Sequence, residues 1–535
     1  MNKLNTLSGG GRPRRTVALM MGATLLSKIL GMLRSVLMSQ RYGTTYQANA
    51  FSEALHIPLT FFDLLFGAAV LGCFIPVFNS FGEDKRGAGR FCGAFMTAVL
   101  TATGALTLLG FLFAPAVVSL AAPGFDGQTR DLCIRLLRML FPIVIFTGAT
   151  YTLVGVMQSG GRYLLPALVS SVSNGCVVVY LAFFDQMAGE AGIYVLALVY
   201  LLSWLAQMLT LLIPLWISGQ RIRLNMDFRT TAFRRALKTV PPIMIGSWLI
   251  PAGLLAGMSF CSLSDVPGAV TVFDYAHTIY LMIAGILTYS ICNYVFPLLS
   301  RRSTAGDSEG FAGLVRNAVM AAMLIVLPFT AGAAVLSGEG VAILYLRGEF
   351  TPADAVYTAQ TLRVLIFAMP AFALNELLSR VFYSRNEVRV PMAAALTGIG
   401  VNVALATVWA LTKGSLFTSM SDVSLIAAAN LAGQAASACV LLGASIRRIP
   451  GVFDRAFAGR LLIILLFAAL SGAVMMGLYR LNGNDPFRAG IVRNIGICAA
   501  VFVPGVLSFA PAVWISRRGF GRKAVNEKRS DGFER

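Results

Sequence analysis

Long apolar stretches separated by short polar ones cover most of the chain. A helix that crosses a membrane needs about 20 consecutive apolar residues. Stretches of this kind occur at 16–40, 48–78, 91–119, 132–157, 166–184, 192–217, 239–261, 268–299, 312–336, 356–382, 390–412, 423–446, 459–479 and 491–515. The first is longer than a signal-peptide core and lacks a clear small-residue cleavage site, so we expect it to be retained. The pattern predicts an all-α polytopic membrane protein with about 14 transmembrane helices.

Composition and charge agree with this prediction and locate the loops. Apolar residues make up 57% of the chain and charged residues 13%, about half the charged share of a soluble domain. The net charge is +19, and most of the 43 Lys and Arg fall in alternate polar segments, most densely at 221–238 and after Trp514. The positive-inside rule makes these segments cytoplasmic, which places both termini in the cytoplasm for an even number of helices. The basic tail indicates contact with anionic lipid headgroups rather than with nucleic acid.

The eight cysteines fall mostly within the apolar segments and never form a Cys-x-x-Cys motif. Free cysteine in such surroundings behaves as a small hydrophobic residue. We therefore expect buried thiols, with neither a disulfide nor a zinc site.

One unit of the sequence occurs twice. An offset of 221 residues relates three pairs: Glu53 and Asp274, His56 and His277, and Pro76 and Pro297. Further along, an offset of 225 relates four more: Phe125 and Phe350, Arg138 and Arg363, Ser159 and Ser384, and Pro166 and Pro391. Each copy holds six predicted helices, so both begin on the same side of the membrane. Parallel repeats of this kind occur in transporters that rock two halves about a site near the midplane.

The repeat predicts two six-helix lobes followed by two further helices. The expected segments are a cytoplasmic tail at 1–15, an N-lobe at 16–220, a basic cytoplasmic linker at 221–238, a C-lobe at 239–448, helices 13 and 14 at 449–516, and a basic cytoplasmic tail at 517–535. Positions 56 and 277 would then lie at equivalent heights on helices 2 and 8 and face a shared axis.

Two basic residues lie inside the first apolar segment. A charge at the bilayer centre costs about 2.5 to 3.5 kcal/mol on insertion scales. A diphosphate would offset this cost, because Arg34 offers a planar fork to phosphate oxygens and Lys28 a mobile point charge. Snorkelling to the interface is the alternative for Arg34. The two residues lie about 120° apart around an ideal helix, so they reach one ligand only if Gly31 permits a bend.

Each histidine follows a carboxylate by three positions, so Glu53 shares a helix face with His56 and Asp274 with His277. Each carboxylate could hydrogen-bond its own histidine and lower the cost of burial. Alternatively, the histidines could line a cavity and change charge near neutral pH. A metal site is the third interpretation, but it needs carboxylates from two more helices, and Asp63 shares helix 2 with Glu53. Separately, Glu376 and Arg380 are i and i+4 on helix 10 and predict an internal salt bridge.

Several short motifs occur in a fixed order between about residue 20 and residue 410. They are SKILGMLRS, NAFSEALHIP, GAAVLGCFIPVF, AAPGFDGQT with RLLRMLFP, QSGGRYLLPAL, YLRGEF and FYSRNEVRVP. In this order they resemble the MurJ/MviN family of lipid II flippases, within the multidrug/oligosaccharidyl-lipid/polysaccharide exporter superfamily.

The resemblance implies a flippase, not an enzyme. Its substrate would be undecaprenyl-diphosphate-linked disaccharide-pentapeptide, moved from the cytoplasmic to the outer leaflet of the bacterial inner membrane for peptidoglycan synthesis. The implied energy source is a coupling cation, Na+ or H+, or the membrane potential, and the implied partners are membrane lipids and the cell-wall synthesis machinery. In the family, helices 1, 2, 7 and 8 line a cationic cavity and the last two helices form a groove for the lipid tail.

Several of the family's charged cavity positions carry other residues in this chain. The family's basic residues on helices 1 and 2 fall on Lys28, Arg34 and His56, and its helix-8 arginine falls on Thr278. Its remaining charged positions fall on Asn49, Phe62 and Gly67. The resemblance and the charge argument together predict substrate binding by Lys28, Arg34, His56 and His277, supported by Glu53, Asn49, Asp274 and Thr278.

Other functions also fit parts of the sequence. A cation-coupled exporter of small molecules would share the repeat, but it would not need helices 13 and 14 for a lipid tail. An exporter of another lipid-linked glycan is the other alternative within the superfamily. A membrane-bound transferase would need a long polar loop with catalytic carboxylates, and no predicted loop is long enough.

Overall fold

The computed structural model describes residues 13–82, 84–185, 187, 189–220, 222–412, 420–483 and 485–514. Helices make up 84% of the chain, and the described residues contain no strand. The all-α prediction is therefore confirmed. The predicted tails at 1–15 and 517–535 lie outside the described residues, apart from the start of the first helix at Pro13.

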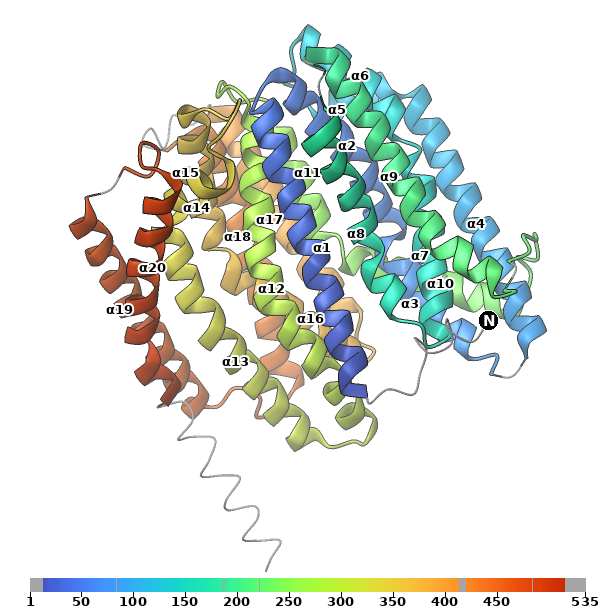
Figure 1. Ribbon diagram of the computed structural model, residues 1–535. Helices are drawn as coiled ribbons and strands as arrows, with labels where there is room; N and C mark the ends of the chain where they lie inside the picture. Colours follow the sequence, from blue (N-terminus) through green and yellow to red (C-terminus); the bar gives the residue numbers. More distant parts are fainter. Residues whose placement is uncertain are drawn as a thin grey trace, which may run out of the picture. The chain divides into compact units, whose positions relative to one another are not determined.

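Contacts between residues divide the chain into two compact units. Unit 1 comprises Met1–Tyr275, Arg347–Asp354 and Val403–Ile426. Its helices are α1 (Pro13–Tyr42), α2 (Tyr46–Phe62), the π-helix η2 (Asp63–Gly67), α3 (Ala68–Asn79), α4 (Lys85–Leu112), α5 (Ala114–Ala121), α6 (Gly127–Leu140), α7 (Ile143–Ser159), α8 (Leu164–Val179), the π-helix η3 (Tyr180–Phe184), α9 (Gly189–Ile217), α10 (Thr231–Gly246), α11 (Leu249–Cys261) and the start of α12 (Ala269–Thr304) (Figure 1).

Unit 2 comprises Ala276–Leu346, Ala355–Asn402 and Ala427–Arg535. It holds the rest of α12 and most or all of α13 (Ser308–Val335), α14 (Ser337–Tyr345), α15 (Pro352–Ile366), α16 (Met369–Ser384), α17 (Arg389–Thr412), α18 (Asp422–Arg448), α19 (Arg455–Asn482) and α20 (Ile491–Ser508).

Several predicted membrane segments are broken into two or three consecutive helices. Segment 48–78 forms α2, η2 and α3, while segment 132–157 changes from α6 to α7 at Phe141 and Pro142, where proline lacks the N–H of a continuous helix. Within the described residues, ten helices are long and apolar enough to cross a membrane, or eleven if α15 and α16, bent by 45°, form one span. The prediction of fourteen spans is consistent with these helices.

The division into units falls later in the chain than the repeat predicts. Unit 1 extends to Tyr275 because α10 packs against α3 and α4, and α11 packs against α2 and α5. The lobe boundaries at 221–238 therefore remain a prediction about the ancestral repeat, whereas the contacts place α10 and α11 with the first unit.

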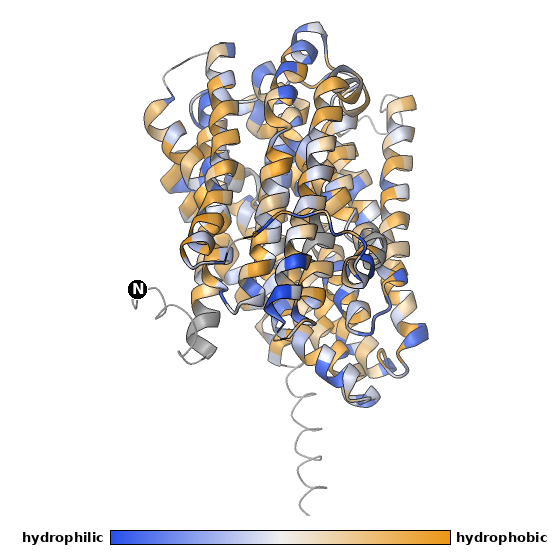
Figure 2. Ribbon diagram, turned by 90° about the vertical axis from the view of Figure 1, so that its right-hand side faces the viewer, coloured by the Kyte–Doolittle hydropathy of each residue, from blue (hydrophilic) through white to orange (hydrophobic). Residues whose placement is uncertain are grey.

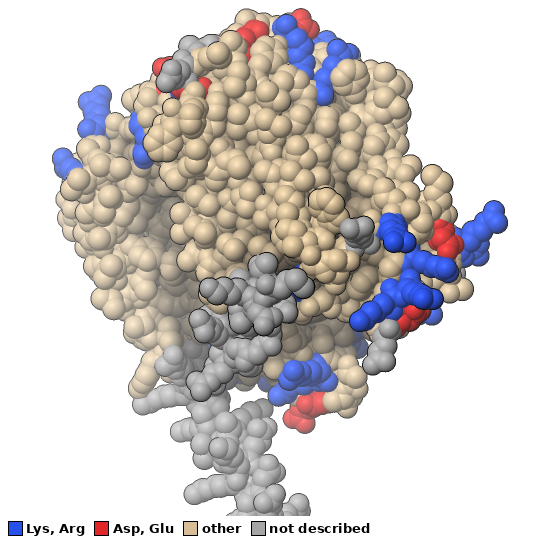
Figure 3. Space-filling view, turned by 45° about the vertical axis from the view of Figure 1, so that its right-hand side comes forward, with Lys and Arg blue, Asp and Glu red and all other residues tan. Residues whose placement is uncertain are grey.

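The surface of the helices suits a lipid environment. Hydrophobic residues colour most of the length of the helices, while hydrophilic residues gather at helix ends and in the connecting turns (Figure 2). On the face shown in Figure 3, charged side chains form a few patches and most of the remaining described surface is uncharged. Together with the apolar helices, this distribution identifies a multi-pass membrane protein.

The cysteines are free, as predicted, but three of them are not buried. Cys73, Cys92, Cys133, Cys261 and Cys292 are buried. Cys176 and Cys439 are exposed, and Cys498 is partly exposed. The apolar sequence around these three reflects helix surface rather than helix core, because a membrane helix can be apolar on its outward face as well.

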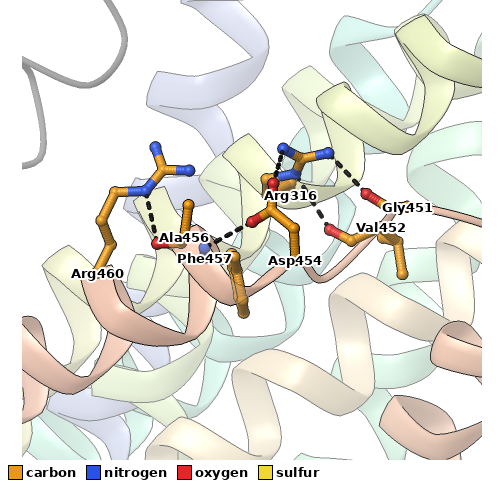
Figure 4. A network of polar contacts seen from close by, with 7 residues as sticks. All are labelled: Arg316, Gly451, Val452, Asp454, Ala456, Phe457 and Arg460. Carbon is orange, nitrogen blue, oxygen red and sulfur yellow. Dashed lines mark hydrogen bonds and ion pairs between the residues drawn. The ribbon is translucent and has the colours of Figure 1, made fainter.

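The α19–α20 hairpin is fixed to α13 in unit 2. Both helices pack against α13, and Figure 1 shows them beside it. At the start of α19, Arg316 of α13 donates to the carbonyl oxygens of Gly451 (2.7 Å) and Val452 (3.2 Å) and forms an ion pair with Asp454 (3.0 Å). Asp454 also caps α19 by accepting from the Phe457 N–H at 2.6 Å (Figure 4). One guanidinium therefore holds the segment that positions the hairpin.

Arg316→Met is expected to lower the thermal stability of the purified protein, because it removes the charged donor that Asp454 and two carbonyl oxygens share. The expected loss is about 1 to 3 kcal/mol, since Asp454 is 41% exposed and water replaces part of the interaction. Arg460→Met is the matched control, because the bond of Arg460 within the described part of the chain is to the Ala456 carbonyl of its own helix. Equal melting temperatures for the two variants would show that Arg316 does not fix the hairpin.

Candidate functional site

Arg34 is held in a fixed position between three helices of unit 1. Its Nη1 donates to Oδ1 of Asn174 on α8 at 2.9 Å, and its guanidinium lies over the ring of Tyr200 on α9, 5.6 Å from the centroid. The Asn174 amide in turn donates to the Ser27 carbonyl at 3.4 Å. An arginine whose side chain is ordered in this way loses less rotamer freedom when it binds an anion. These contacts lie inside the protein, which argues against simple snorkelling of Arg34.

Close packing of α1 on α8 creates this arrangement. The hydroxyls of Ser27 and Ser171 are 2.6 Å apart, and a Cβ at Gly31 would stand 3.4 Å from the Asn174 amide nitrogen. Helix α1 is continuous through Gly31, so the glycine allows the neighbouring helix to approach. The Lys28 side chain is exposed, and no hydrogen-bond or ion-pair partner for it occurs among the described residues.

Polar contacts between three residue pairs join α2 to the first two turns of α12, and we call them the α2–α12 ladder. Oδ1 of Asn49 accepts from the Thr271 N–H at 2.9 Å and from its hydroxyl at 2.7 Å. One oxygen of Asp274 accepts from the Ser52 hydroxyl at 3.1 Å, and the other lies 3.1 Å from Nε2 of His56. The ladder therefore uses Asn49 and Asp274, both expected to support the cavity, together with His56.

The carboxylate–histidine pairing differs from the simplest sequence interpretation. His56 pairs with Asp274 of the other repeat copy instead of with Glu53, its neighbour on α2. Glu53 is fully buried, and neither of its carboxyl oxygens has a hydrogen-bond partner. The idea of a self-satisfied Glu53–His56 pair is therefore wrong for this structure. Glu53 and His56 do share a face of α2, but Asp274 of α12 takes the place of Glu53 as the partner of His56. The spacing of residues in the sequence does not reveal this partner.

The two histidines do not have equivalent surroundings. The His56 side chain is 23% exposed, whereas His277 in unit 2 is buried and packs its ring against Tyr280 at 5.6 Å between centroids. Thr278, next to it, is partly exposed. The described part of the chain contains no group of three or more His, Cys, Asp or Glu suited to hold the metal ion of the third interpretation.

Unit 2 contains the salt bridge predicted on helix 10. Arg380 lies 3.6 Å from Glu376, which confirms the pair. Two residues of α12 complete the surroundings of Arg380: Asn293 accepts from its Nη1 at 2.9 Å, and the Tyr289 ring lies 5.9 Å from its guanidinium. The pair is thus anchored between α16 and α12.

A loop of the second repeat copy docks on the turn between α1 and α2. The Glu349 N–H donates to the Gln40 carbonyl at 2.9 Å, and Asp354 accepts from the Thr44 hydroxyl at 2.7 Å. Gly348 and Gly43 both have positive φ, and a Cβ on either would overlap a backbone oxygen across this contact. We call this contact the 347–354 clasp. It belongs entirely to unit 1.

Sequence reasoning missed the clasp and the residues that hold Arg34. Asn174 and Ser171 stand in the run SSVSNG within an apolar segment, and intramembrane polar groups of this kind are a signal for an interior contact. The clasp includes part of the YLRGEF motif at 345–350, which supported the family resemblance but did not indicate a contact with the turn between α1 and α2.

Comparisons with known proteins agree on one family. A sequence model of the family described as lipid II flippase MurJ matches residues 38–485. A protein of Rhizobium meliloti named "Probable lipid II flippase MurJ" is 27% identical and aligns over 96% of this chain and 98% of its own length. A protein of Bdellovibrio bacteriovorus with the same name is 27% identical over 74% of this chain and 76% of its own length.

Solved structures share the fold. A structure titled as lipid II flippase MurJ in an inward closed conformation superposes with a TM-score of 0.76 at 19% identity, covering 94% of this chain and 99% of that one. An inward-facing multidrug resistance transporter of the MATE family gives a TM-score of 0.63 at 14% identity, covering 81% and 98%. At these identities the likeness concerns the fold.

Proposed function

Because the chain belongs to the lipid II flippase MurJ family, whose sequence model covers residues 38–485, we propose that it moves lipid II from the cytoplasmic to the outer leaflet of the bacterial inner membrane. Lipid II is an undecaprenyl-diphosphate-linked disaccharide-pentapeptide, and moving it makes and breaks no covalent bond. The protein therefore acts as a transporter that alternates access to its site, rather than as an enzyme.

The arrangement of Arg34 is the observation that carries the substrate proposal. A diphosphate is the most highly charged part of the lipid, and an arginine binds its oxygens through two parallel N–H donors. Asn174 occupies only Nη1 of Arg34, and Tyr200 lies against the face of the guanidinium, so further donors remain for the phosphate. Lys28 lies six residues earlier and about 120° around the continuous α1, so we propose that its charge attracts the anionic head group without sharing the phosphate contact of Arg34.

The lipid tail requires an apolar surface outside the polar site. Leucines of α19 provide one, because Leu462, Leu466 and Leu470 are 57%, 61% and 52% exposed. They recur at i, i+4 and i+8 and so form one stripe along the helix. We propose that the undecaprenyl chain lies against this stripe, with Arg316 holding the hairpin in place.

Replacement of the lipid II flippase in cells tests the function. A bacterium whose own lipid II flippase is depleted should continue to grow when it expresses this chain. Lysis despite a normal amount of the protein in the membrane would contradict the proposal and favour export of another molecule.

The proposed orientation places both termini in the cytoplasm, and single cysteines test it. Gly127→Cys should react with a membrane-impermeant thiol reagent in intact cells, because it is exposed at the start of α6 on the outer side. Arg229→Cys, exposed between α9 and α10, should react only after permeabilisation. Cys176, Cys439 and Cys498 must first be replaced, since they are exposed or partly exposed.

Two further positions extend the topology test. Lys413 and Gly521 lie outside the described residues, and cysteines there should behave like those at Gly127 and Arg229 respectively. The reverse labelling pattern at all four positions would invert the proposed direction of transport.

A further inference from the structure

Glu53 is a buried ionisable group that the proposed substrate contacts do not use. It lies on one stripe of α2 with the ladder residues Asn49, Ser52 and His56, at i, i+3, i+4 and i+7. The side chains on either side of it are bonded to α12, but both of its own oxygens lack a hydrogen-bond partner, and it is 0% exposed. Burying a polar group without a partner is costly, so this position calls for an explanation.

The surroundings of Glu53 do not suit an ionised carboxylate. The charged group that acts on it is Asp274, which has the same sign, and the Ser52 hydroxyl and His56 ring are directed to Asp274. Among the described residues, Cys133 of α6 and Cys261 of α11 also lie in electrostatic range of Glu53. A carboxylate ion removed from water with no donor and no cation costs far more than the neutral acid.

The other helices that pack against α2 supply further titratable groups, of which Tyr200 lies in electrostatic range of both Arg34 and Asp274. Tyr200 of α9 contacts Phe51, and Tyr151 of α7 contacts Phe62. Asp63 stands in η2, about ten residues and nearly three turns further along the chain. Helix α5 has no titratable side chain.

We propose that Glu53 is a proton-binding site of the transport cycle. Its carboxyl group carries the proton in the state described here and releases it to water when the α2–α12 ladder opens. The O–H bond of the acid breaks, the electron pair stays on the carboxylate, and the proton returns when the ladder closes again. The role in transport rests on the proposed flippase function, whereas the protonated state does not.

A proton fits this site better than sodium. Hard cations such as Na+, Mg2+ and Ca2+ take several oxygen ligands, as the coordination of Ca2+ and Mg2+ illustrates. Within the described residues no group of three or more His, Cys, Asp or Glu could hold a metal ion, and neither Glu53 oxygen has a hydrogen-bond partner. A proton needs only the carboxyl group itself.

The ladder gives the site a route to water. The side chains of His56 and Asp274 are 23% and 13% exposed, so the ladder borders accessible space while Glu53 behind it does not. The boundary between the two units falls within α12, directly after Tyr275, and the ladder holds the two turns before it. Separating these turns from α2 would uncover the stripe that contains Glu53.

Infrared spectroscopy of the full chain in lipid nanodiscs tests the protonated state directly. At neutral pH the protein should show the C=O stretch of a neutral carboxylic acid, and labelling with 13C-glutamate should shift it. The band should be missing in Glu53→Gln and retained in Glu376→Gln, whose carboxylate is paired with Arg380. Absence of the band from the unmodified protein, or its full retention in Glu53→Gln, would overturn the proposal.

Transport by Glu53→Gln tests proton release. The amide resembles the protonated acid in shape but cannot ionise, so the variant should reach the membrane at normal levels and transport should fall by at least about tenfold. If Glu53→Gln transports at the rate of the unmodified protein, Glu53 has only a structural role and the proposal is overturned. If the unmodified protein itself moves no lipid II, the flippase proposal fails, while the infrared result still decides the protonated state.

Discussion

Arg34→Ala is expected to reach the membrane in normal amounts and to fail to support cells depleted of their own lipid II flippase. The variant removes the oriented guanidinium proposed to bind the diphosphate. A hydrogen bond to a charged group contributes about 1.5 to 3 kcal/mol, so loss of two such bonds predicts a decrease in transport of more than about a hundredfold.

Two further variants separate charge from orientation. Arg34→Lys keeps the charge but loses the planar fork, so transport should be weak but measurable. Asn174→Ala keeps Arg34 and removes the acceptor that holds its Nη1, so the affinity for substrate should fall while the maximal rate changes less. A rate of transport in Asn174→Ala equal to that of the unmodified protein at every substrate concentration would show that the contact is structural only.

Arg135→Ala is the matched control for Arg34→Ala. Arg135 is an exposed arginine of α6 that bonds the Asp131 carbonyl of its own helix. It should retain transport. Equal activity in the Arg34 and Arg135 variants would contradict the assignment of Arg34 to the substrate site.

Gly348→Ala is expected to prevent the 347–354 clasp from closing and to abolish transport. Gly348 has φ of 61°, and an added Cβ would overlap the Gln40 carbonyl oxygen, which cannot move without disturbing α1. An alanine in the left-handed region of φ and the overlap with the Gln40 oxygen together cost about 2 to 5 kcal/mol. This cost is enough to lower the population of the closed clasp by more than about tenfold. The clasp is formed in the state described here, and a transporter that alternates access cannot complete its cycle if one of its states is lost.

Labelling of a cysteine at Thr44 measures the state of the clasp. In the unmodified clasp Thr44 is partly covered and bonded to Asp354, so Thr44→Cys should react slowly. Adding Gly348→Ala should accelerate this reaction by at least about tenfold. The measurement requires the background without Cys176, Cys439 and Cys498.

Gly306→Ala separates backbone strain from overlap. Gly306 has φ of 72°, but a Cβ there would meet nothing within 4 Å. In this variant the free energy of unfolding should fall only by the backbone strain, about 1 to 2 kcal/mol, and transport should be retained. If Gly306→Ala and Gly348→Ala lower transport equally, backbone strain rather than loss of the clasp explains the loss of transport.

Hydropathy predicted the helices well but could not predict their breaks. Membrane helices must satisfy their own backbone hydrogen bonds, so a long apolar run leaves few alternatives to a helix. The change to a π-helix falls at Asp63, and the bend between α15 and α16 falls next to Pro370 at the start of α16, but the apolar pattern continues across both breaks. The cysteines show the same limit, since an apolar helix surface and an apolar core have the same composition in a membrane protein.

The sequence by itself determined the all-α membrane fold and the family motifs, because these depend on local composition and on the order of residues along the chain. It also determined the Glu376–Arg380 salt bridge, whose partners are one helical turn apart. Only the tertiary structure decided the partners of Arg34 and His56, which are Asn174 and Asp274, 140 and 218 residues away. Many acceptors in an apolar chain could serve either residue, and the packing of helices distant in sequence selects one of them. The same packing leaves Glu53 buried without a partner, although the sequence places a histidine three residues from it.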